Sequence, residues 1–199
     1  MRKAIHHLKK ADPVLAAIIE QVGSCKMNYD EPAFAALAEA IVYQQLHGKA
    51  AATIFKRLTD LAGLPLIPEG ILKLSEEQMR SAGLSKQKLS YLRDLAAKTQ
   101  SGELDFACLP QLSDEEVINR LTAVKGIGVW TAHMFLMFSL RRPDVLPVGD
   151  LGVQAAIRKH YRKRKMPKPA QMEKIAKIWS PYRSVACWYL WRSLDIKTL

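Results

Sequence analysis

The sequence lacks several features that define common protein classes. It has only three cysteines, Cys25, Cys108 and Cys187, which are far apart and form no C-x-x-C pair, so a zinc or iron–sulfur site built on cysteine is not expected. An odd number of cysteines with no signal peptide favours a reducing, intracellular compartment. The longest apolar run near the N-terminus, Val14 to Ile19, is too short to cross a bilayer, so we expect no membrane partner.

Acidic side chains are scarce in one part of the chain. Residues 1–150 hold 18 basic and 17 acidic residues, whereas residues 151–199 hold 12 basic and only 2 acidic residues. Nearly all of the formal net charge of +11 therefore lies in the last quarter of the 199-residue chain. Charge concentrated in this way favours a polyanionic partner over a general gain in solubility.

Signals for β-strands are also scarce, whereas signals for helix ends are frequent. Apolar residues recur at helical spacing from Phe34 to Ile41, and Pro181 fits the first turn of a last helix, Tyr182 to Leu194. Other helix starts are indicated at Asp12-Pro13 and at two capping boxes, Ser75 with Gln78 and Ser113 with Glu116. We therefore expect an all-α protein.

The most informative segment is Gly126-Ile127-Gly128, which joins two expected helices in a hairpin of residues 121–132. Two glycines around one apolar residue allow a tight turn with positive φ, and Ile127 can fill the space between the helices. The amides of the turn and of the following helix N-terminus then converge on a site for a phosphate oxygen, with Lys125 beside it. A simple corner between two helices fits this short motif as well.

The rest of the chain carries a resemblance to a known family. About twenty residues after the turn comes Pro147-Val-Gly-Asp150-Leu151, and further blocks lie at Ile41–Leu46, Gly83–Leu92 and Trp179–Arg192. In this ordered combination, over roughly residues 30–195, the sequence resembles the helix-hairpin-helix (HhH-GPD) DNA glycosylase superfamily. It is most similar to the alkylation-repair branch, the 3-methyladenine DNA glycosylase II type, in a compact form.

The resemblance implies a catalytic role for Asp150. Breaking the N-glycosidic bond of a damaged purine builds positive charge on the deoxyribose, which a fixed carboxylate can stabilise. The same carboxylate could orient or deprotonate water. Local sequence also makes Asp150 a good N-cap for a helix beginning at Leu151, and the two roles are compatible.

A lysine is missing where bifunctional members of the superfamily have one. In those members, a lysine two residues after the turn attacks the sugar as a Schiff-base nucleophile. This chain has Trp130 at that position, and Lys125 lies before the turn. The resemblance therefore implies hydrolysis that leaves an abasic site, with no lyase activity.

The resemblance also implies a pocket for a base flipped out of the duplex. Trp130 and Trp191 match the family's pocket aromatics, which attract cationic alkylated purines such as 3-methyladenine and 7-methylguanine by stacking and cation–π contacts. Met134 stands where one branch of the family has a tyrosine. Trp179 and Trp188 are interpreted as core residues.

Residues 43–46 match the segment with which the family fills the gap left by the base. Gln45 is expected at its tip, next to Leu46, and Tyr43 is assigned to the substrate pocket although relatives often have glycine there. Lys88 is expected to contact a DNA phosphate. The hairpin is expected to bind the DNA backbone through Lys125, Gly126, Ile127, Gly128 and Thr131.

The resemblance implies a single glycosylase unit of two helical lobes, residues 33–133 and residues 1–32 with 134–199, with the active site in the cleft between them. We expect a monomer that binds double-stranded DNA containing alkylated bases, in the cytoplasm, nucleoid or nucleus. No metal site is assigned and no organic cofactor is implied, although a monovalent cation at the hairpin is compatible with the sequence. Two alternatives stay open: a non-catalytic helix-hairpin-helix DNA-binding module, and a glycosylase for another lesion such as hypoxanthine or uracil.

Overall fold

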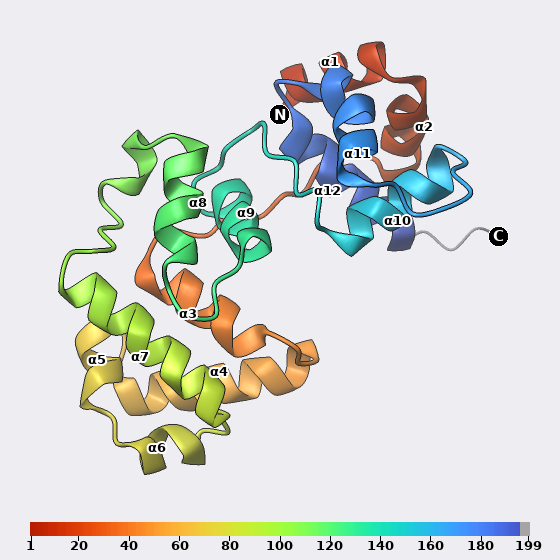
Figure 1. Cartoon of the computed structure of the whole chain (residues 1–199). Coiled ribbons are helices and arrows are strands. Elements are labelled where there is room, and N and C mark those ends of the chain that lie inside the picture. Colours follow the sequence, from red (N-terminus) through yellow and green to blue (C-terminus); the bar gives the residue numbers. More distant parts are fainter. Residues whose placement is uncertain (196–199) are drawn as a thin grey trace. The chain divides into compact units, whose positions relative to one another are not determined.

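The computed structural model describes residues 1–195, and the regular structure of this part is entirely helical (Figure 1). The expected all-α fold is thereby confirmed; residues 196–199 of the expected second lobe lie outside the described residues. None of the described helices is both long and apolar enough to cross a membrane. The chain divides into two compact units. Unit 1 joins Met1–Tyr29 to the chain from Arg141 onward, and unit 2 is Asp30–Leu140.

The boundary of unit 2 differs from the one expected at residue 133. That boundary would cut helix α9 (Val129–Phe138), whereas the structure keeps the whole helix in unit 2. The reason is packing, because α9 lies against α8 (Asp114–Thr122) and α3 (Phe34–Tyr43) of the same unit.

Unit 2 is organised around helix α7 (Lys86–Gln100). This helix packs against α3, α5 and α6, and its Leu89, Leu92 and Leu95 are buried. Unit 2 also contains α4, which follows α3 in the chain, and a 3₁₀ turn, η1, which lies between α7 and α8. The bounds not yet given are α4 (Gly48–Ala62), α5 (Pro68–Lys73), α6 (Glu76–Ser81) and η1 (Leu109–Gln111).

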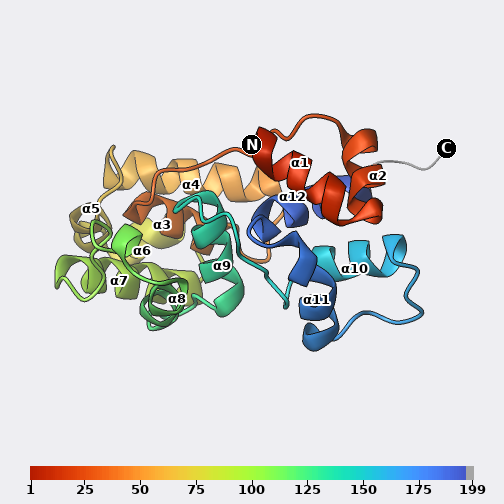
Figure 2. The ribbon, with the colours of Figure 1, turned by 90° about the horizontal axis from the view of Figure 1, so that it is seen from above.

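Unit 1 combines segments from the two ends of the described chain, as Figure 2 shows by their colours. Its last helix, α12 (Arg183–Asp195), packs against both α2 and α10, and α2 packs against α1. Trp179 and Trp188 are buried in this unit, which confirms their interpretation as core residues. The remaining elements are α1 (Arg2–Ala11), α2 (Pro13–Val22), α10 (Leu151–His160), α11 (Pro169–Ala176) and η2 (Lys177–Trp179).

The expected helix starts are confirmed by their hydrogen bonds. Ser75 and Ser113 both form complete capping boxes with the residues three positions on. Asp12 caps α2 with Oδ1, while its Oδ2 accepts hydrogen bonds from the Tyr161 hydroxyl (2.6 Å) and from Trp179 Nε1 (2.8 Å). Because all these donors surround a carboxylate that is only 2% exposed, Asp12 is a structural residue that ties α2 to the second half of unit 1.

The last helix begins at Arg183, one residue later than the expected start at Tyr182. Pro181 precedes α12 instead of lying in its first turn, because the helix begins at Arg183. The segment before α10 supplies the partners at this end: the Arg183 amide donates to Asp144 Oδ1 (3.1 Å) and the Ser184 amide donates to the Pro143 carbonyl (3.0 Å). These tertiary bonds satisfy two of the amides at the helix start.

Candidate functional site

The hairpin turn needs a glycine at only one of its two glycine positions. Gly126 has φ +81°, and a Cβ atom there would lie 2.1 to 2.4 Å from ring atoms of Tyr91. Gly128 has φ −95° and caps α9, and a Cβ atom there would meet nothing within 4 Å. The sequence suggested positive φ for a turn with two glycines, but only Gly126 has it. Ile127 is buried, as expected for the residue that fills the corner.

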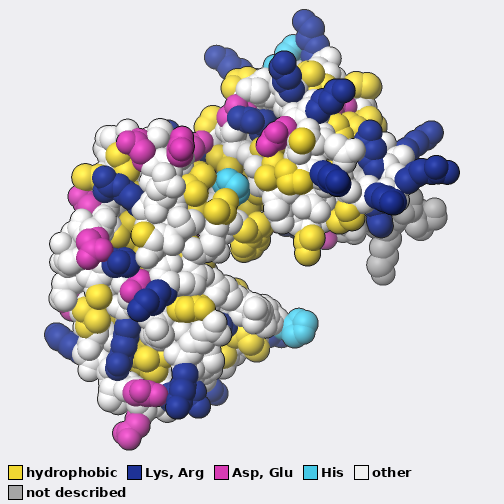
Figure 3. Space-filling view, in the orientation of Figure 1, with side chains coloured by type: hydrophobic (Ala, Val, Ile, Leu, Met, Phe, Trp, Pro, Cys, Tyr) yellow, Lys and Arg dark blue, Asp and Glu magenta, His cyan; other side chains and the backbone are white. Residues whose placement is uncertain are grey.

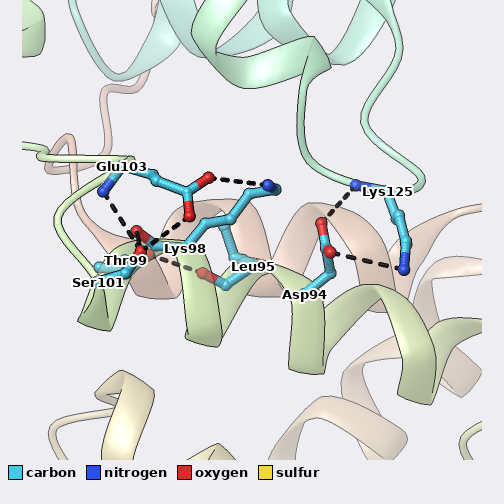
Figure 4. Close-up of polar contacts among 7 residues, drawn as sticks. All are labelled: Asp94, Leu95, Lys98, Thr99, Ser101, Glu103 and Lys125. Carbon is cyan, nitrogen blue, oxygen red and sulfur yellow. Dashed lines mark hydrogen bonds and ion pairs between the residues drawn. The ribbon is translucent and has the colours of Figure 1, made fainter.

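Helix α7 holds the hairpin from the side. The Lys125 amide donates to Asp94 Oδ2 at 2.9 Å, and Lys125 Nζ lies 3.8 Å from Asp94 Oδ1 (Figure 4). The Lys125 side chain is 67% exposed, so its ammonium is accessible from solvent next to the turn. Tyr91 and Asp94 both belong to α7, so this helix contacts the turn through the Tyr91 ring at Gly126 and through the Asp94 carboxylate at Lys125.

A pocket of about 340 Å³ lies within unit 2 and collects most of the residues assigned to the base site. Tyr43, Trp130 and Met134 line it, together with Gln45 and Thr131. Trp130 is 51% exposed, so much of its indole surface is open to a ligand. The other lining residues are Asp30, Ala36, Leu37, Ala40, Gln44, Phe135, Phe138 and Ser139.

The pocket lining mixes polar and apolar side chains, and its polar members are Asp30, Tyr43, Gln44, Gln45, Thr131 and Ser139. Burial, the Glu39 charge and a hydrogen bond to Glu39 raise the pKa of the Tyr43 phenol, so the phenol is uncharged at neutral pH. Most of the remaining lining is apolar or aromatic, which suits a flat organic ring.

Residues 43–46, the α3–α4 corner, lie between this pocket and the hairpin. Gln44 Nε2 donates to the Gly126 carbonyl at 2.8 Å, and Gln45 takes the left-handed conformation with φ +56°. Gln45 and Leu46 are exposed, as a segment that enters DNA requires. A second hollow of about 410 Å³ borders the corner, and its lining includes Gln45, Lys88, Gly126, Gly128 and Trp130.

Lys88 is engaged with the protein backbone. Its Nζ donates to the carbonyls of Val42 (2.6 Å) and Gln44 (2.7 Å), and burial lowers the pKa of its ammonium. The sequence assigned this lysine to a DNA phosphate. The observed contacts instead place it at the C-terminal end of α3, where a cation stabilises the last carbonyls of a helix.

Asp150 and Trp191 lie together in unit 1. Asp150 caps α10, and its Oδ1 accepts hydrogen bonds from the Val153 amide (2.6 Å) and from Trp191 Nε1 (2.8 Å). The residue is only 7% exposed. The carboxylate is therefore oriented by two donors and held at the positive end of a helix dipole.

Sequence reasoning missed Gly152, which makes this pairing possible. A Cβ atom at this position would lie 2.9 Å from Trp191 Cδ1 and 3.1 Å from Asp150 Oδ1. Sequence reasoning included Gln44 and Tyr91 in the blocks of the family resemblance without giving either a role of its own, and it missed Asp94, which accepts from the Lys125 amide. A glycine two residues after the capping position, within the first turn of a helix, is the one local signal that pointed to a close approach.

Positive charge is concentrated on unit 1. Every lysine and arginine from Arg158 to Lys168 is exposed, and dark blue side chains spread over the face of unit 1 that Figure 3 shows. Among the described residues, no three His, Cys, Asp or Glu side chains gather in a group that could hold a metal ion.

The structure thus contains a helical hairpin with a glycine turn, a pocket bordered by an exposed tryptophan, and an aspartate that caps a later helix. A comparison of the sequence with protein families gives a consistent result. Residues 38–181 match the model of the HhH-GPD superfamily base excision DNA repair proteins. The chain belongs to this superfamily. DNA-3-methyladenine glycosylase 1 of Schizosaccharomyces pombe is 38% identical over 200 residues, which cover 97% of this chain and 87% of that protein.

Solved structures of related proteins have the same fold. The S. pombe 3-methyladenine DNA glycosylase in complex with abasic DNA superposes with a TM-score of 0.84 at 37% identity, covering 98% of this chain and 97% of that one. A DNA-3-methyladenine glycosidase from Bacillus halodurans has a TM-score of 0.82 at 40% identity, covering 93% and 85%. These similarities extend the match over nearly the whole chain.

Proposed function

We propose that this protein is a DNA glycosylase that hydrolyses the N-glycosidic bond of alkylated purines, such as 3-methyladenine and 7-methylguanine, in duplex DNA, and so begins base excision repair. The observation that carries the proposal is the Asp150 carboxylate, nearly buried and fixed by two donors in a chain that also holds a DNA-binding type of hairpin. Relatives named as 3-methyladenine glycosylases support the choice of substrate class.

Asp150 supplies the negative charge that this reaction needs. As the base departs with the electrons of the C1′–N bond, the deoxyribose becomes positively charged, and a carboxylate oriented in advance stabilises that charge without reorganising. Water then adds to C1′ and loses a proton, while the base leaves as the neutral purine. The reaction uses water and one carboxylate, and it needs no organic cofactor.

The pocket of unit 2 is proposed to bind the flipped base. An alkylated purine carries a positive charge, so the exposed face of Trp130 attracts it more strongly than a normal base. Tyr43 and Met134 complete the wall, and the flexible methionine side chain tolerates more than one lesion shape. Trp191 is assigned first to Asp150, because its indole N–H is already donated to the carboxylate.

The proposed enzyme cuts only the glycosidic bond. The position two residues after the turn holds Trp130, which cannot form a Schiff base, and the ammonium of Lys125 lies near Asp94 beside the turn. We expect no covalent protein–DNA adduct when borohydride is added during the reaction. A trapped adduct that disappears in Lys125→Met would contradict this part of the proposal.

The proposed DNA partner is bound as duplex by a monomer. The hairpin amides and Lys125 would hold one strand, and the exposed basic segment from Arg158 to Lys168 adds non-specific attraction to phosphates. Binding of undamaged duplex should therefore weaken steeply as salt is raised.

Base release from methylated duplex DNA, resolved by chromatography, tests the proposed reaction. Asn is as good an N-cap as Asp, so Asp150→Asn should keep the fold and most of the DNA affinity while lowering base release by at least about 100-fold. Asp60→Asn, the same change at an exposed site on α4, serves as a control and should release base like the wild type. Full activity in Asp150→Asn would overturn the assignment, and DNA binding with no release of any lesion would favour a non-catalytic binding module.

A further inference from the structure

The α3–α4 corner is not well held by its own backbone. Within it, the Gln44 amide reaches the Ile41 carbonyl at 3.4 Å and the Leu46 amide reaches the Tyr43 carbonyl at 3.3 Å, both at the long end for such bonds. Gln45 has φ +56°, a conformation that a residue with a side chain adopts at an energetic cost. Something outside the corner must therefore maintain its shape.

Two side-chain contacts from distant parts of unit 2 do so. Lys88, in the first turn of α7, donates to the Val42 and Gln44 carbonyls at 2.6 and 2.7 Å. Gln44 in turn donates to the Gly126 carbonyl at 2.8 Å. The first contact anchors the corner to α7, and the second joins it to the hairpin turn.

We infer that Lys88 and Gln44 are positioning residues, which hold the α3–α4 corner ready to enter DNA and couple it to the hairpin. The inference rests on the proposed function, because it concerns how the same enzyme opens the duplex. If the corner is ordered before DNA binds, no part of the binding free energy is needed to order it. More of that free energy can then offset the cost of unstacking and unpairing the base. The contact with Gly126 places the corner at a defined position relative to the strand that the hairpin grips.

Lys88 has a role distinct from that of a phosphate contact. Its ammonium is shared between two carbonyls at the end of α3, whereas Lys86, two residues earlier in α7, is exposed. Removing a phosphate contact weakens binding to every DNA alike and lowers the salt dependence by about one unit. Removing a positioning residue should instead act only where a stacked, paired base has to be extruded.

The test compares Lys88→Met and Gln44→Met with Lys86→Met on two substrates: an alkylated purine paired in duplex, and the same lesion on a single strand. We expect Lys88→Met and Gln44→Met to lower kcat on the paired lesion by about 10-fold or more and to change it much less on the single strand. Lys88→Arg, which keeps donors for the carbonyls, should recover part of the loss. Lys86→Met should change both substrates equally.

Equal losses on both substrates with a reduced salt slope in Lys88→Met, or wild-type activity in both Lys88→Met and Gln44→Met, would overturn the inference. Gln44→Met leaves the Lys88 contacts in place, so it still tests the idea if Lys88→Met does not fold. If the wild type releases no alkylated base at all, the proposed function fails separately. The inference is then read from 2-aminopurine fluorescence in bound duplex, which should rise with wild type and not with Lys88→Met, and equal signals would contradict it.

Discussion

Two helix N-termini carry the proposed chemistry, and they differ in the residue that caps them. Helix α9 begins after Gly128, which offers no side chain as a cap and has open space around it. Helix α10 begins after Asp150, whose carboxylate accepts the Val153 amide and the Trp191 indole. Both helices present the positive end of a dipole, but only α10 brings its own anion.

This difference shows how one backbone arrangement serves two purposes. A helix start whose cap residue has no side chain can accept an anion from outside, such as a DNA phosphate. A start that is already occupied by a carboxylate cannot, but it fixes that carboxylate in position for chemistry. Substitutions that make one start resemble the other therefore separate binding from catalysis.

The largest effect is expected when the N-cap of α10, Asp150, is replaced by glycine, the residue that caps α9. Asp150→Gly removes the carboxylate, and base release should fall by about 10²- to 10⁴-fold. The fold should lose about 1–3 kcal/mol, because glycine is an acceptable N-cap but leaves the Trp191 indole N–H without the Asp150 acceptor. Single-turnover base release and urea unfolding measure the two quantities. A large loss of stability together with the loss of activity would mean that Asp150 acts mainly as a cap.

The next largest effect concerns the two glycines that precede α9. Gly126→Ala forces a Cβ atom into the Tyr91 ring and a left-handed φ on alanine, so we expect a loss of about 2–4 kcal/mol in unfolding free energy. Gly128→Ala is the matched control, with negative φ and open space, and should cost less than about 1 kcal/mol. Similar losses in both variants would show that the turn is not held by Tyr91.

How far the sequence predicted these features depended on whether the cause was local. The starts of α2, α6 and α8 were predictable because the capping residue and its partner are two or three positions apart. Helix α1, which has no side-chain cap, gave no comparable signal.

The features that the sequence did not predict depend on residues far apart in the chain. The two glycines of the hairpin look alike in sequence, and only the ring of Tyr91, 35 positions away from Gly126, distinguishes them. Lys88 was assigned to DNA from its charge and its place in the family resemblance, and its contacts with the Val42 and Gln44 carbonyls were not predicted because these lie more than forty positions earlier. Asp150 shows the other limit: its capping bond was predictable locally, whereas its bond to Trp191 depends on the packing of α10 against α12.

A smaller effect is expected when the N-cap of α9, Gly128, is replaced by aspartate, the residue that caps α10. Asp fits the extended backbone of Gly128, so Gly128→Asp should leave the fold intact or stabilise it by a few tenths of a kcal/mol. The new carboxylate would repel a phosphate at the same amides, and duplex affinity should fall by about 30- to 100-fold. Gly128→Asn supplies a similar cap without charge and should lose much less affinity. Titrations with labelled duplex at two salt concentrations measure this, and equal affinities for the Asp and Asn variants would rule out a phosphate at this site.

The smallest effect tests how Asp150 itself is held. Trp191→Phe keeps an aromatic ring but removes the N–H that donates to Oδ1, so the carboxylate is less well oriented. We expect base release, measured in single turnovers, to fall by about 10-fold. Gly152→Ala, whose Cβ atom would lie 2.9 Å from Trp191 Cδ1, should lower base release in the same direction. Wild-type rates of base release in both variants would show that Trp191 serves only to pack against the helix.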